Sequence, residues 1–254
     1  MILQAQNLTV AIGGKVICRD LNVAIQAGEC WGVLGQNGVG KTTLLRTLAG
    51  LYAPQAGVVS CNGIALPAHA RRDLARHLAV LMQNETGEFW GSVLEYVLLG
   101  RFPYRSTLFG YSAQDEAVAL QALASMDLAP LAQRPLNALS GGERQRAAIA
   151  QVLAQQAQCY ILDEPLQHLD VRHQAQTMQL FAQLRQQRNM LLIALHDMLW
   201  AQRCCDHVLL MFADGHVLHG RAQELLTHTH LEALYQCPLR EWVVEGERCY
   251  APGV

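Results

Sequence analysis

The octapeptide Gly35-Gln36-Asn37-Gly38-Val39-Gly40-Lys41-Thr42 fits the pattern G-x-x-x-x-G-K-[ST]. In this pattern, glycines let the backbone curl so that its N–H groups converge on a polyphosphate. The lysine ammonium faces the outer phosphates, and the hydroxyl of the next residue can coordinate Mg²⁺. The octapeptide therefore predicts a phosphate-binding loop.

The flanking sequence supports this interpretation over a chance glycine-rich turn. Residues 30–34 form a short apolar run typical of a buried strand, and residues 42–49 predict a helix that ends at Gly50. A loop between a strand and a helix N-terminus lies where the backbone dipole favours anions. The chain has 19 Lys+Arg, yet Lys15 and Lys41 are its only lysines. A compact ammonium suits the loop better than a guanidinium.

Composition limits the class of protein. The 254 residues are 51% hydrophobic and 16% charged, which is typical of a globular chain with one large core. A net charge of −2 argues against a broad nucleic-acid-binding surface. No apolar run approaches the roughly 18 residues that span a bilayer, and residues 1–4 show no secretory signal. The eight cysteines form no C-x-x-C pair, so we expect buried, reduced thiols.

The order of predicted elements gives the fold class. Residues 2–25 alternate in polarity around a turn at Gly13-Gly14, residues 93–153 are helical in pattern, and apolar strands return at 159–162, 191–195 and 208–212. This order predicts an α/β fold with a mostly parallel sheet, an N-terminal antiparallel β subdomain and an inserted helical subdomain. We expect one domain over 1–254. Its core covers 1–83 and 155–230, the helical insertion 84–154, and a short C-terminal extension 231–254.

Two carboxylates follow the apolar run 159–162. Adjacent residues on an extended chain point to opposite sides, so Asp163 and Glu164 can divide the chemistry. Asp163 is expected to hold Mg²⁺ through its water shell, and Glu164 to polarise the water that attacks the terminal phosphate. The alternative is that the two carboxylates only mark a solvated strand end, where acidic residues are common. The predicted phosphate loop favours the catalytic interpretation over this alternative.

A second helix start lies far along the chain. Ser140 and Glu143 form S-x-x-E, the capping-box pattern, before a helix predicted over 144–155. Gly141 and Gly142 leave amide groups exposed there, which predicts a second anion site compatible with the cap. His196, at the end of an apolar strand, and Gln83 say little by themselves.

Together and in this order, these motifs resemble the nucleotide-binding subunits of ATP-binding cassette (ABC) transporters. The resemblance covers about residues 2 to 230. The matching stretches are residues 35–42 for the Walker A loop, Gln83 for the Q-loop, 139–143 for the LSGGE signature, 161–165 for Walker B with its catalytic glutamate, 168–170 for the D-loop, and His196 for the switch histidine.

The resemblance implies ATP and Mg²⁺ as cofactors and a head-to-tail dimer of two copies. Each ATP would lie between the Walker A loop of one copy and the signature of the other. The implied nucleotide-binding residues are Gly35, Gln36, Asn37, Gly38, Val39, Gly40, Lys41, Thr42, Thr43, Ser140, Gly141, Gly142 and Asp170. The implied metal-binding residues are Thr42, Gln83 and Asp163, and the implied catalytic residues are Glu164, His196 and Gln83. Gln83 would also sense a membrane partner, and His196 would contact the γ-phosphate.

One subgroup of the family fits better than the others. The segment 93–104, Asp115 and the tail 231–250 resemble importers of iron–siderophore, haem and cobalamin. The resemblance implies an ATPase at the cytoplasmic face of the membrane, with integral membrane permease subunits, and a substrate-binding protein that acts through the permease. No nucleic acid is expected. A soluble non-transport ABC ATPase and an exporter subunit are the alternatives.

Three features of the sequence go beyond the shared motifs. Ile12 stands where many members place an aromatic ring against adenine, and Leu166-Gln167 replaces the usual small polar pair. The stretch 88–104 is rich in aromatics, which predicts that it forms a permease-docking groove with Gln83. The alternative is that these rings fill the core of the helical subdomain. The aromatics expected to form the groove are Phe89, Trp90, Phe102 and Tyr104.

Overall fold

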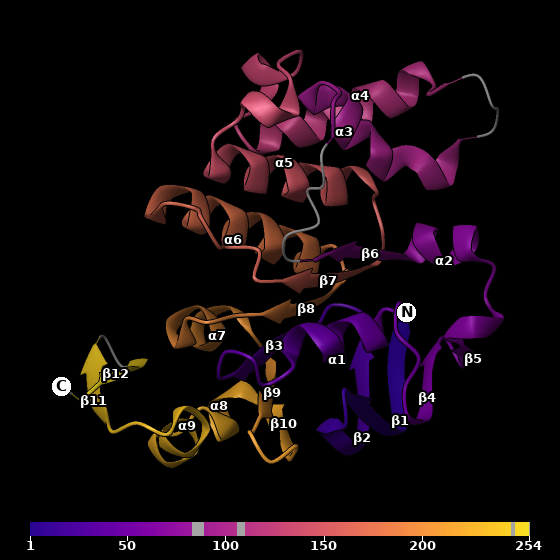
Figure 1. The fold of residues 1–254 in the computed structure, drawn as a ribbon. Coiled ribbons are helices and arrows are strands. Elements are labelled where there is room, and N and C mark those ends of the chain that lie inside the picture. The colour runs from indigo at the N-terminus through magenta and orange to yellow at the C-terminus, as the bar shows by residue number, and fades with distance from the viewer. Residues whose placement is uncertain (83–88, 106–109, 245–246, 254) are drawn as a thin grey trace.

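A mostly parallel sheet forms the centre of the molecule. The computed structural model describes residues 1–82, 89–105, 110–244 and 247–253. Within this part the sheet has the order β10-β9-β3-β8-β7-β6, and only β10 runs antiparallel to its neighbour (Figure 1). Its strands are β3 (Cys30–Gly35), β6 (Leu78–Leu81), β7 (Cys159–Asp163), β8 (Met190–Ala194), β9 (His207–Met211) and β10 (Val217–Arg221). The predicted fold class is confirmed.

The N-terminal residues form a separate antiparallel sheet, also as predicted. Its order in the described residues is β2-β1-β4-β5, and a turn at Gly13-Gly14 joins β1 to β2. The strands are β1 (Ile2–Ile12), β2 (Lys15–Gln26), β4 (Ala56–Cys61) and β5 (Ile64–Ala65). Helix α1 (Lys41–Leu48) contacts both β1 and β7, so it lies between the two sheets.

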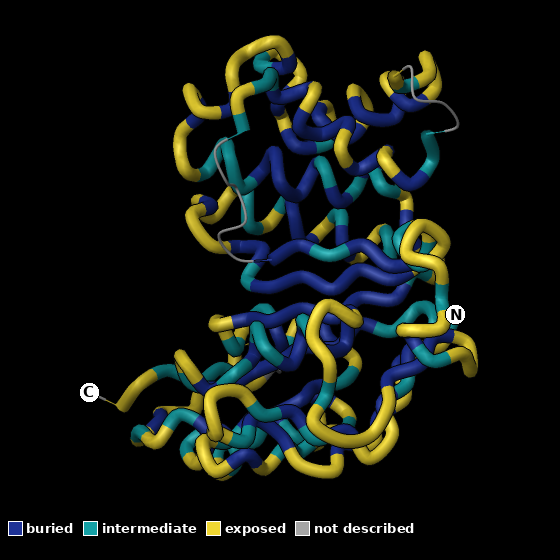
Figure 2. The backbone as a smooth tube through the Cα atoms, turned by 45° about the vertical axis from the view of Figure 1, so that its right-hand side comes forward, coloured by how far each residue is buried: buried dark blue, intermediate teal, exposed yellow. Residues whose placement is uncertain are grey.

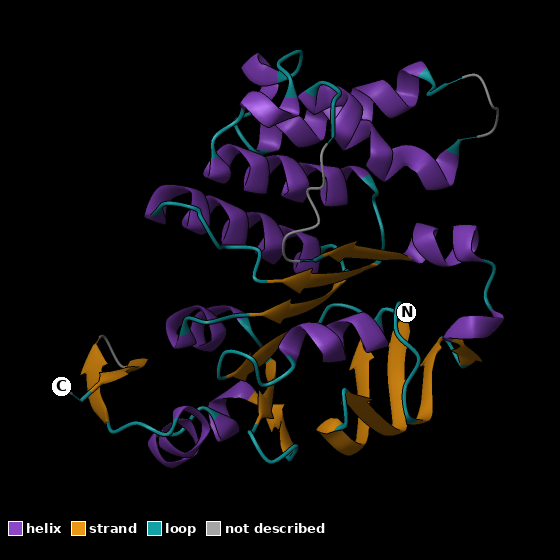
Figure 3. Cartoon of the chain, in the orientation of Figure 1, coloured by secondary structure: helices purple, strands orange, loops and turns teal. Residues whose placement is uncertain are grey.

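Helices cover the other face of the parallel sheet (Figure 3). The chain between β6 and β7 contributes α3 (Val93–Leu98), the 3₁₀ segment η2 (Leu99–Tyr104), α4 (Ala113–Ser125) and α5 (Gly141–Ala154), which pack on one another. Helix α5 begins three residues earlier than predicted because Ser140 caps it. The remaining helices are α2 (Arg71–His77), α6 (Val171–Gln186), α7 (Met198–Cys204), α8 (Ala222–Leu225) and α9 (His228–Tyr235), with short 3₁₀ turns η1 (Leu66–Ala68), η3 (Ala129–Leu131) and η4 (Leu136–Ala138).

The C-terminal residues form a two-stranded hairpin of β11 (Leu239–Val244) and β12 (Glu247–Pro252). The hairpin stands at the margin of the molecule (Figure 1). Among the described residues, no helix combines the length and the apolar character needed to cross a membrane.

Two hydrophobic cores lie on opposite faces of the parallel sheet. Alternate residues of β7 divide between them: Ile161 packs with α1 and the antiparallel sheet, whereas Tyr160 and Leu162 pack with the helices. The parallel strands are therefore buried on both faces, and they appear as dark blue bands through the centre of Figure 2. The carboxyl ends of β3, β7 and β8 meet at one edge of a rigid sheet, which positions the residues that follow them.

Candidate active site

The phosphate loop runs from the end of β3 to the start of α1. Gly40 caps α1 with a φ of 117°, and a Cβ there would come 2.4 Å from Cγ2 of Ile17. A side chain at this position is therefore excluded by backbone conformation and by space. The first turn of α1 carries no acidic residue. Its N-terminal amide groups are thus available to an anion.

Lys41 is buried at the start of α1. Its Nζ donates hydrogen bonds to the carbonyl oxygens of Gly35 at 2.9 Å and Gln36 at 3.2 Å. Burial lowers the pKa of Lys41 from its ordinary value, and the nearby carboxylates of Glu164 and Asp163 oppose that shift. Neutral carbonyls hold the ammonium in place, and a phosphate would be a stronger acceptor.

Thr42 and Asp163 meet across 121 residues of sequence. The Thr42 hydroxyl donates to Oδ2 of Asp163 at 2.5 Å, while Oδ1 of Asp163 is buried with no hydrogen-bond partner among the described residues. Burial raises the pKa of Asp163, and the bond from Thr42 opposes the increase. A hydroxyl beside a carboxylate with an unused buried oxygen offers the hard oxygen donors that Mg²⁺ prefers, so the residues fit this ion.

Glu164 pairs with His196. Oε1 of Glu164 lies 2.5 Å from Nε2 of His196, and the glutamate side chain is only 9% exposed. The expectation that Glu164 continues the extended strand is wrong. Strand β7 ends at Asp163, and Glu164 adopts a left-handed conformation with φ 51°. Both carboxylates lie close enough to Lys41 to interact with its charge. Asp163 and Glu164 therefore belong to one site, and the opposite directions expected for neighbours on a strand do not apply.

These groups surround one cavity of about 520 Å³. The residues that line it are Ile12, Lys15, Ile17, Asn37, Gly38, Gly40, Lys41, Thr42, Thr43, Glu164, Gln167 and His196. Sequence reasoning missed Lys15, Ile17 and Gln167 as site residues. The rarity of lysine could have indicated Lys15, and the unusual Leu166-Gln167 pair could have indicated Gln167. Of the other loop residues, Gly35 and Gln36 hold Lys41 through their carbonyls, and Val39 is buried.

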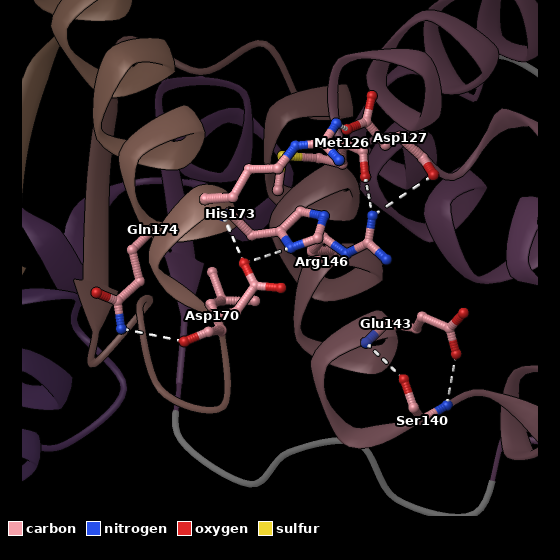
Figure 4. A network of polar contacts seen from close by, with 10 residues as sticks. Met126, Asp127, Ser140, Glu143, Arg146, Asp170, His173 and Gln174 are labelled. Carbon is pink, nitrogen blue, oxygen red and sulfur yellow. Dashed lines mark hydrogen bonds and ion pairs between the residues drawn. The ribbon is translucent and has the colours of Figure 1, made fainter.

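The second predicted anion site does not reach this cavity. Figure 4 shows the confirmed capping box, in which Ser140 N donates to Glu143 Oε2 at 2.7 Å and Glu143 N donates to Ser140 Oγ at 3.3 Å. Asp170 likewise caps α6, accepting from His173 N at 2.9 Å. A Cβ on Gly142 would lie 2.9 Å from the His168 carbonyl oxygen. The signature and the turn before α6 are therefore packed together, outside the cavity of their own chain. Gln83 lies outside the described residues.

Comparisons with known proteins agree with this geometry. The model of the ABC transporter family matches residues 18–167. The chain is 34% identical to the iron(3+)-hydroxamate import ATP-binding protein FhuC of Bacillus subtilis, over 92% of this chain and 87% of that protein. It is 39% identical to the hemin import ATP-binding protein HmuV of Pseudomonas fluorescens, over 92% of each. A solved metal-chelate type ABC transporter in an inward-facing conformation superposes with a TM-score of 0.83 at 28% identity, over 98% of this chain and 96% of that chain.

The fold and the cavity define a nucleotide-binding ATPase built on a phosphate loop and a strand that ends in two carboxylates. The chain belongs to the ABC transporter family. It is an ATP-binding subunit with ATPase activity.

Proposed function

We propose that this chain is the ATP-hydrolysing subunit of an importer for a metal chelate such as iron–siderophore, haem or cobalamin. It would work at the cytoplasmic face of the membrane with permease subunits and, through them, a substrate-binding protein. One observation carries the proposal. Lys41, the Thr42–Asp163 pair and the Glu164–His196 pair surround one cavity in a chain whose relatives are import ATP-binding proteins.

In the proposed mechanism, the α1 N-terminus and Lys41 bind the phosphates of ATP. Thr42 and Asp163 would hold Mg²⁺, with Gln83 as a further expected ligand, and the ion supplies neutralisation of phosphate charge. Glu164 orients the attacking water and accepts its proton. His196, already 2.5 Å from Glu164, keeps that carboxylate directed at the terminal phosphate.

The proposed assembly is a head-to-tail dimer. The chain's own cavity lacks Ser140, Gly141 and Gly142, although these residues present a helix N-terminus suited to an anion. In the proposed dimer they complete the cavity of the second copy, and Asp170 lies beside the same interface. A dimeric ABC transporter cassette supports the pairing of two copies: its structure superposes with a TM-score of 0.75 at 26% identity.

The proposed contact with the permease uses two exposed rings near α3. Trp90 is 79% exposed and Phe102 is 62% exposed. The other two aromatics expected in the groove contact the protein itself: Phe89 packs edge-on against Tyr96 at 5.5 Å, and the Tyr104 ring lies 3.9 Å from the Arg101 guanidinium carbon. The alternative of an internal role therefore holds for Phe89 and Tyr104. Exposed rings of this kind are common interface anchors.

Co-purification tests the partnership. The wild-type chain should bring a many-helix membrane protein with it, while Trp90→Ala and Phe102→Ala should lose that protein and keep basal ATP hydrolysis. The matched control is Trp242→Ala, which removes a tryptophan that is 45% exposed on the C-terminal hairpin. Equal complex formation by all three variants would place the interface elsewhere.

Transport by the purified complex in proteoliposomes separates import from export. When ATP is supplied on the membrane face that carries this subunit, an importer should move the metal chelate across the membrane to that same face. Movement of cargo away from that side would support the exporter alternative. A chain that purifies without any membrane partner would support the non-transport alternative.

A further inference from the structure

Both lysines of the chain line the nucleotide cavity. Lys41 is the phosphate-loop lysine, and Lys15 lies at the start of β2, opposite Ile12 of β1. Arginine supplies every other basic side chain apart from histidine. A second ammonium in this cavity is therefore a distinctive feature, and the proposed mechanism does not use it.

The lining of the cavity combines residues from two parts of the fold. Glu164 and His196, which act on the terminal phosphate in the proposed mechanism, follow strands of the parallel sheet. Ile12, Lys15 and Ile17 come from the antiparallel sheet. When a nucleotide places its phosphates on Lys41 and its last phosphate at Glu164, its ribose and base are the parts left to contact the residues of the antiparallel sheet. Lys15 is the one charged residue among the three.

Lys15 makes one long side-chain hydrogen bond to the phosphate loop. Its Nζ donates to the carbonyl oxygen of Gly38 at 3.3 Å, which is a long bond to a neutral acceptor, and the residue is exposed. An ammonium has three donors and no acceptor. It can therefore exchange the long bond to Gly38 for a shorter one, or use its other donors, when further acceptors come within reach. Ribose hydroxyls and purine ring nitrogens carry lone pairs that can accept such bonds.

The geometry points to Lys15 as a nucleotide-binding residue: we propose that its ammonium holds the ribose and base of the bound purine nucleotide. This inference rests on nucleotide occupying the cavity. Ile12 offers an aliphatic contact that is 51% exposed, and no Phe, Tyr or Trp of the described residues lines the cavity. A hydrogen bond from Lys15 would add to the binding of the base or ribose where Ile12 provides no stacking.

Binding measurements on Lys15→Met test the proposal. This variant keeps an unbranched side chain of similar bulk and removes the charge. Its affinity for ATP and GTP should fall about tenfold, the usual effect of losing one hydrogen bond to a charged group. Inorganic tripolyphosphate, which has neither ribose nor base, should bind unchanged. The matched control is Arg19→Met, which removes an exposed cation on the same strand outside the cavity.

The same measurements identify the contacted atoms. A base contact predicts a larger loss for GTP than for ATP, because guanine O6 adds an acceptor. A ribose contact predicts equal losses for ATP and GTP and no loss for 2′,3′-dideoxy-ATP. Equal weakening of tripolyphosphate would overturn the proposal, since it would show that Lys15 only holds the phosphate loop through Gly38. Unchanged affinity for every ligand would also overturn it.

Chemical labelling of the wild-type protein gives an independent measurement. An amine-acylating reagent followed by peptide mass spectrometry reports on Lys15 directly, because only two lysines can react. ATP should protect Lys15, and tripolyphosphate should leave it reactive. Equal protection by both ligands, or none by ATP, contradicts the assignment. Acylation of Lys41 is the internal control. Protection of Lys41 by ATP or by tripolyphosphate shows that the ligand occupies the cavity, and its absence shows that the cavity is empty under that condition.

Discussion

At the residue scale, the active site depends on where β7 stops. The strand ends at Asp163, and the left-handed conformation of Glu164 turns the chain toward His196. The metal-binding and water-activating carboxylates are thus neighbours in sequence with different partners: Asp163 bonds Thr42, and Glu164 lies against His196. Substitution of Asp163 and substitution of Glu164 should therefore change different properties of the protein.

Glu164→Gln should bind ATP normally and lose hydrolysis by about 10²–10⁴-fold, because the amide cannot accept the proton of the attacking water. Lys41→Ala is the contrasting variant. It should weaken nucleotide binding itself, by roughly 2–5 kcal/mol, because a buried charge facing the phosphates is removed. Equilibrium binding and steady-state turnover, measured on both, separate the two roles. Near-normal turnover by Glu164→Gln would reject it as the catalytic residue.

Asp163 should make the stability of the nucleotide-free protein depend on pH. Burial raises its pKa above the ordinary 3.8, so the native state binds this proton more tightly than the unfolded state. The free energy of unfolding should therefore fall as pH rises from the ordinary Asp pKa through the raised one. Asp163→Asn, which does not titrate, should lack this part of the slope. Urea titrations with a chelator present compare the two proteins, and parallel pH profiles would contradict the prediction.

Ile12 predicts weak discrimination between bases. Stacking on an aromatic ring is worth roughly 1–3 kcal/mol, and an aliphatic side chain recovers only part of it. ATP and GTP should therefore be hydrolysed with similar kcat/KM, and Ile12→Tyr should tighten the binding of both. A preference for ATP above about a hundredfold, roughly 2.7 kcal/mol, would show that another residue reads adenine.

At the element scale, a buried ion pair joins η2 to α4 and α5. Nε of Arg101 lies 2.9 Å from Oδ1 of Asp115, and both side chains are less than 9% exposed. Arg101 also donates to the Ala154 carbonyl at the end of α5. Asp115 itself belongs to the capping box of α4 with Ser112. Arg101 therefore connects η2 to α4, 14 residues along the chain, and to the end of α5, 53 residues along the chain.

Arg101→Ala should lower the free energy of unfolding by about 3–5 kcal/mol, because it leaves Asp115 buried without its cation. The loss should shrink at acid pH. In the wild-type protein, burial tends to raise the pKa of Asp115, but hydrogen bonds from Ser112 and Arg101 outweigh it and lower the pKa. The stabilisation by Arg101 is therefore fully present above the ordinary Asp pKa and disappears as the carboxylate takes up a proton below it. Denaturant titration measures the effect. Arg172→Ala breaks an ion pair to Asp127 whose arginine side chain is 79% exposed, and it should cost less than about 1 kcal/mol. Equal effects of the two variants would contradict this account.

At the scale of the whole molecule, the parallel sheet separates the phosphate loop from the signature. The loop and α1 belong to the core shared with the antiparallel sheet, and α5 packs in the core on the opposite face. The cavity and the signature are thus held on different parts of one rigid frame. A head-to-tail dimer would bring the two together from different copies.

Mixed dimers test that arrangement. Lys41→Ala disables the loop half, and Gly141→Asp should disable the signature half by repelling phosphate; a Cβ at Gly141 meets no atom within 4 Å, so folding should be unaffected. Each variant alone should be inactive. Mixing them should restore ATP-dependent association and hydrolysis, because one composite site is then intact. Lys41→Ala mixed with Glu164→Gln is the control for hydrolysis, since both defects lie in the same half and neither composite site can then turn over ATP. Failure of the first mixture to recover either property would reject the head-to-tail model.

Much of this protein follows from short-range patterns in its sequence. The strand–loop–helix around residues 35–42, the capping box of Ser140 and the apolar run before Asp163 each depend on residues only a few positions apart. Local hydrogen bonds and side-chain periodicity determine such elements, so the order of strands and helices, and with it the fold class, could be predicted. The terminal residues of the elements were less predictable, as α5 shows.

Only the tertiary structure decided which distant residues share the site. Strand order places β8 between β3 and β7, which brings His196 to Glu164. Packing of the antiparallel sheet over α1 places Lys15 and Ile17 in the cavity. Packing among the helices between β6 and β7 decided that Trp90 is exposed, whereas the Tyr104 ring lies against Arg101. These outcomes depend on contacts between elements that are far apart in the chain, and sequence spacing carries no information about the relative placement of surfaces that meet only after folding.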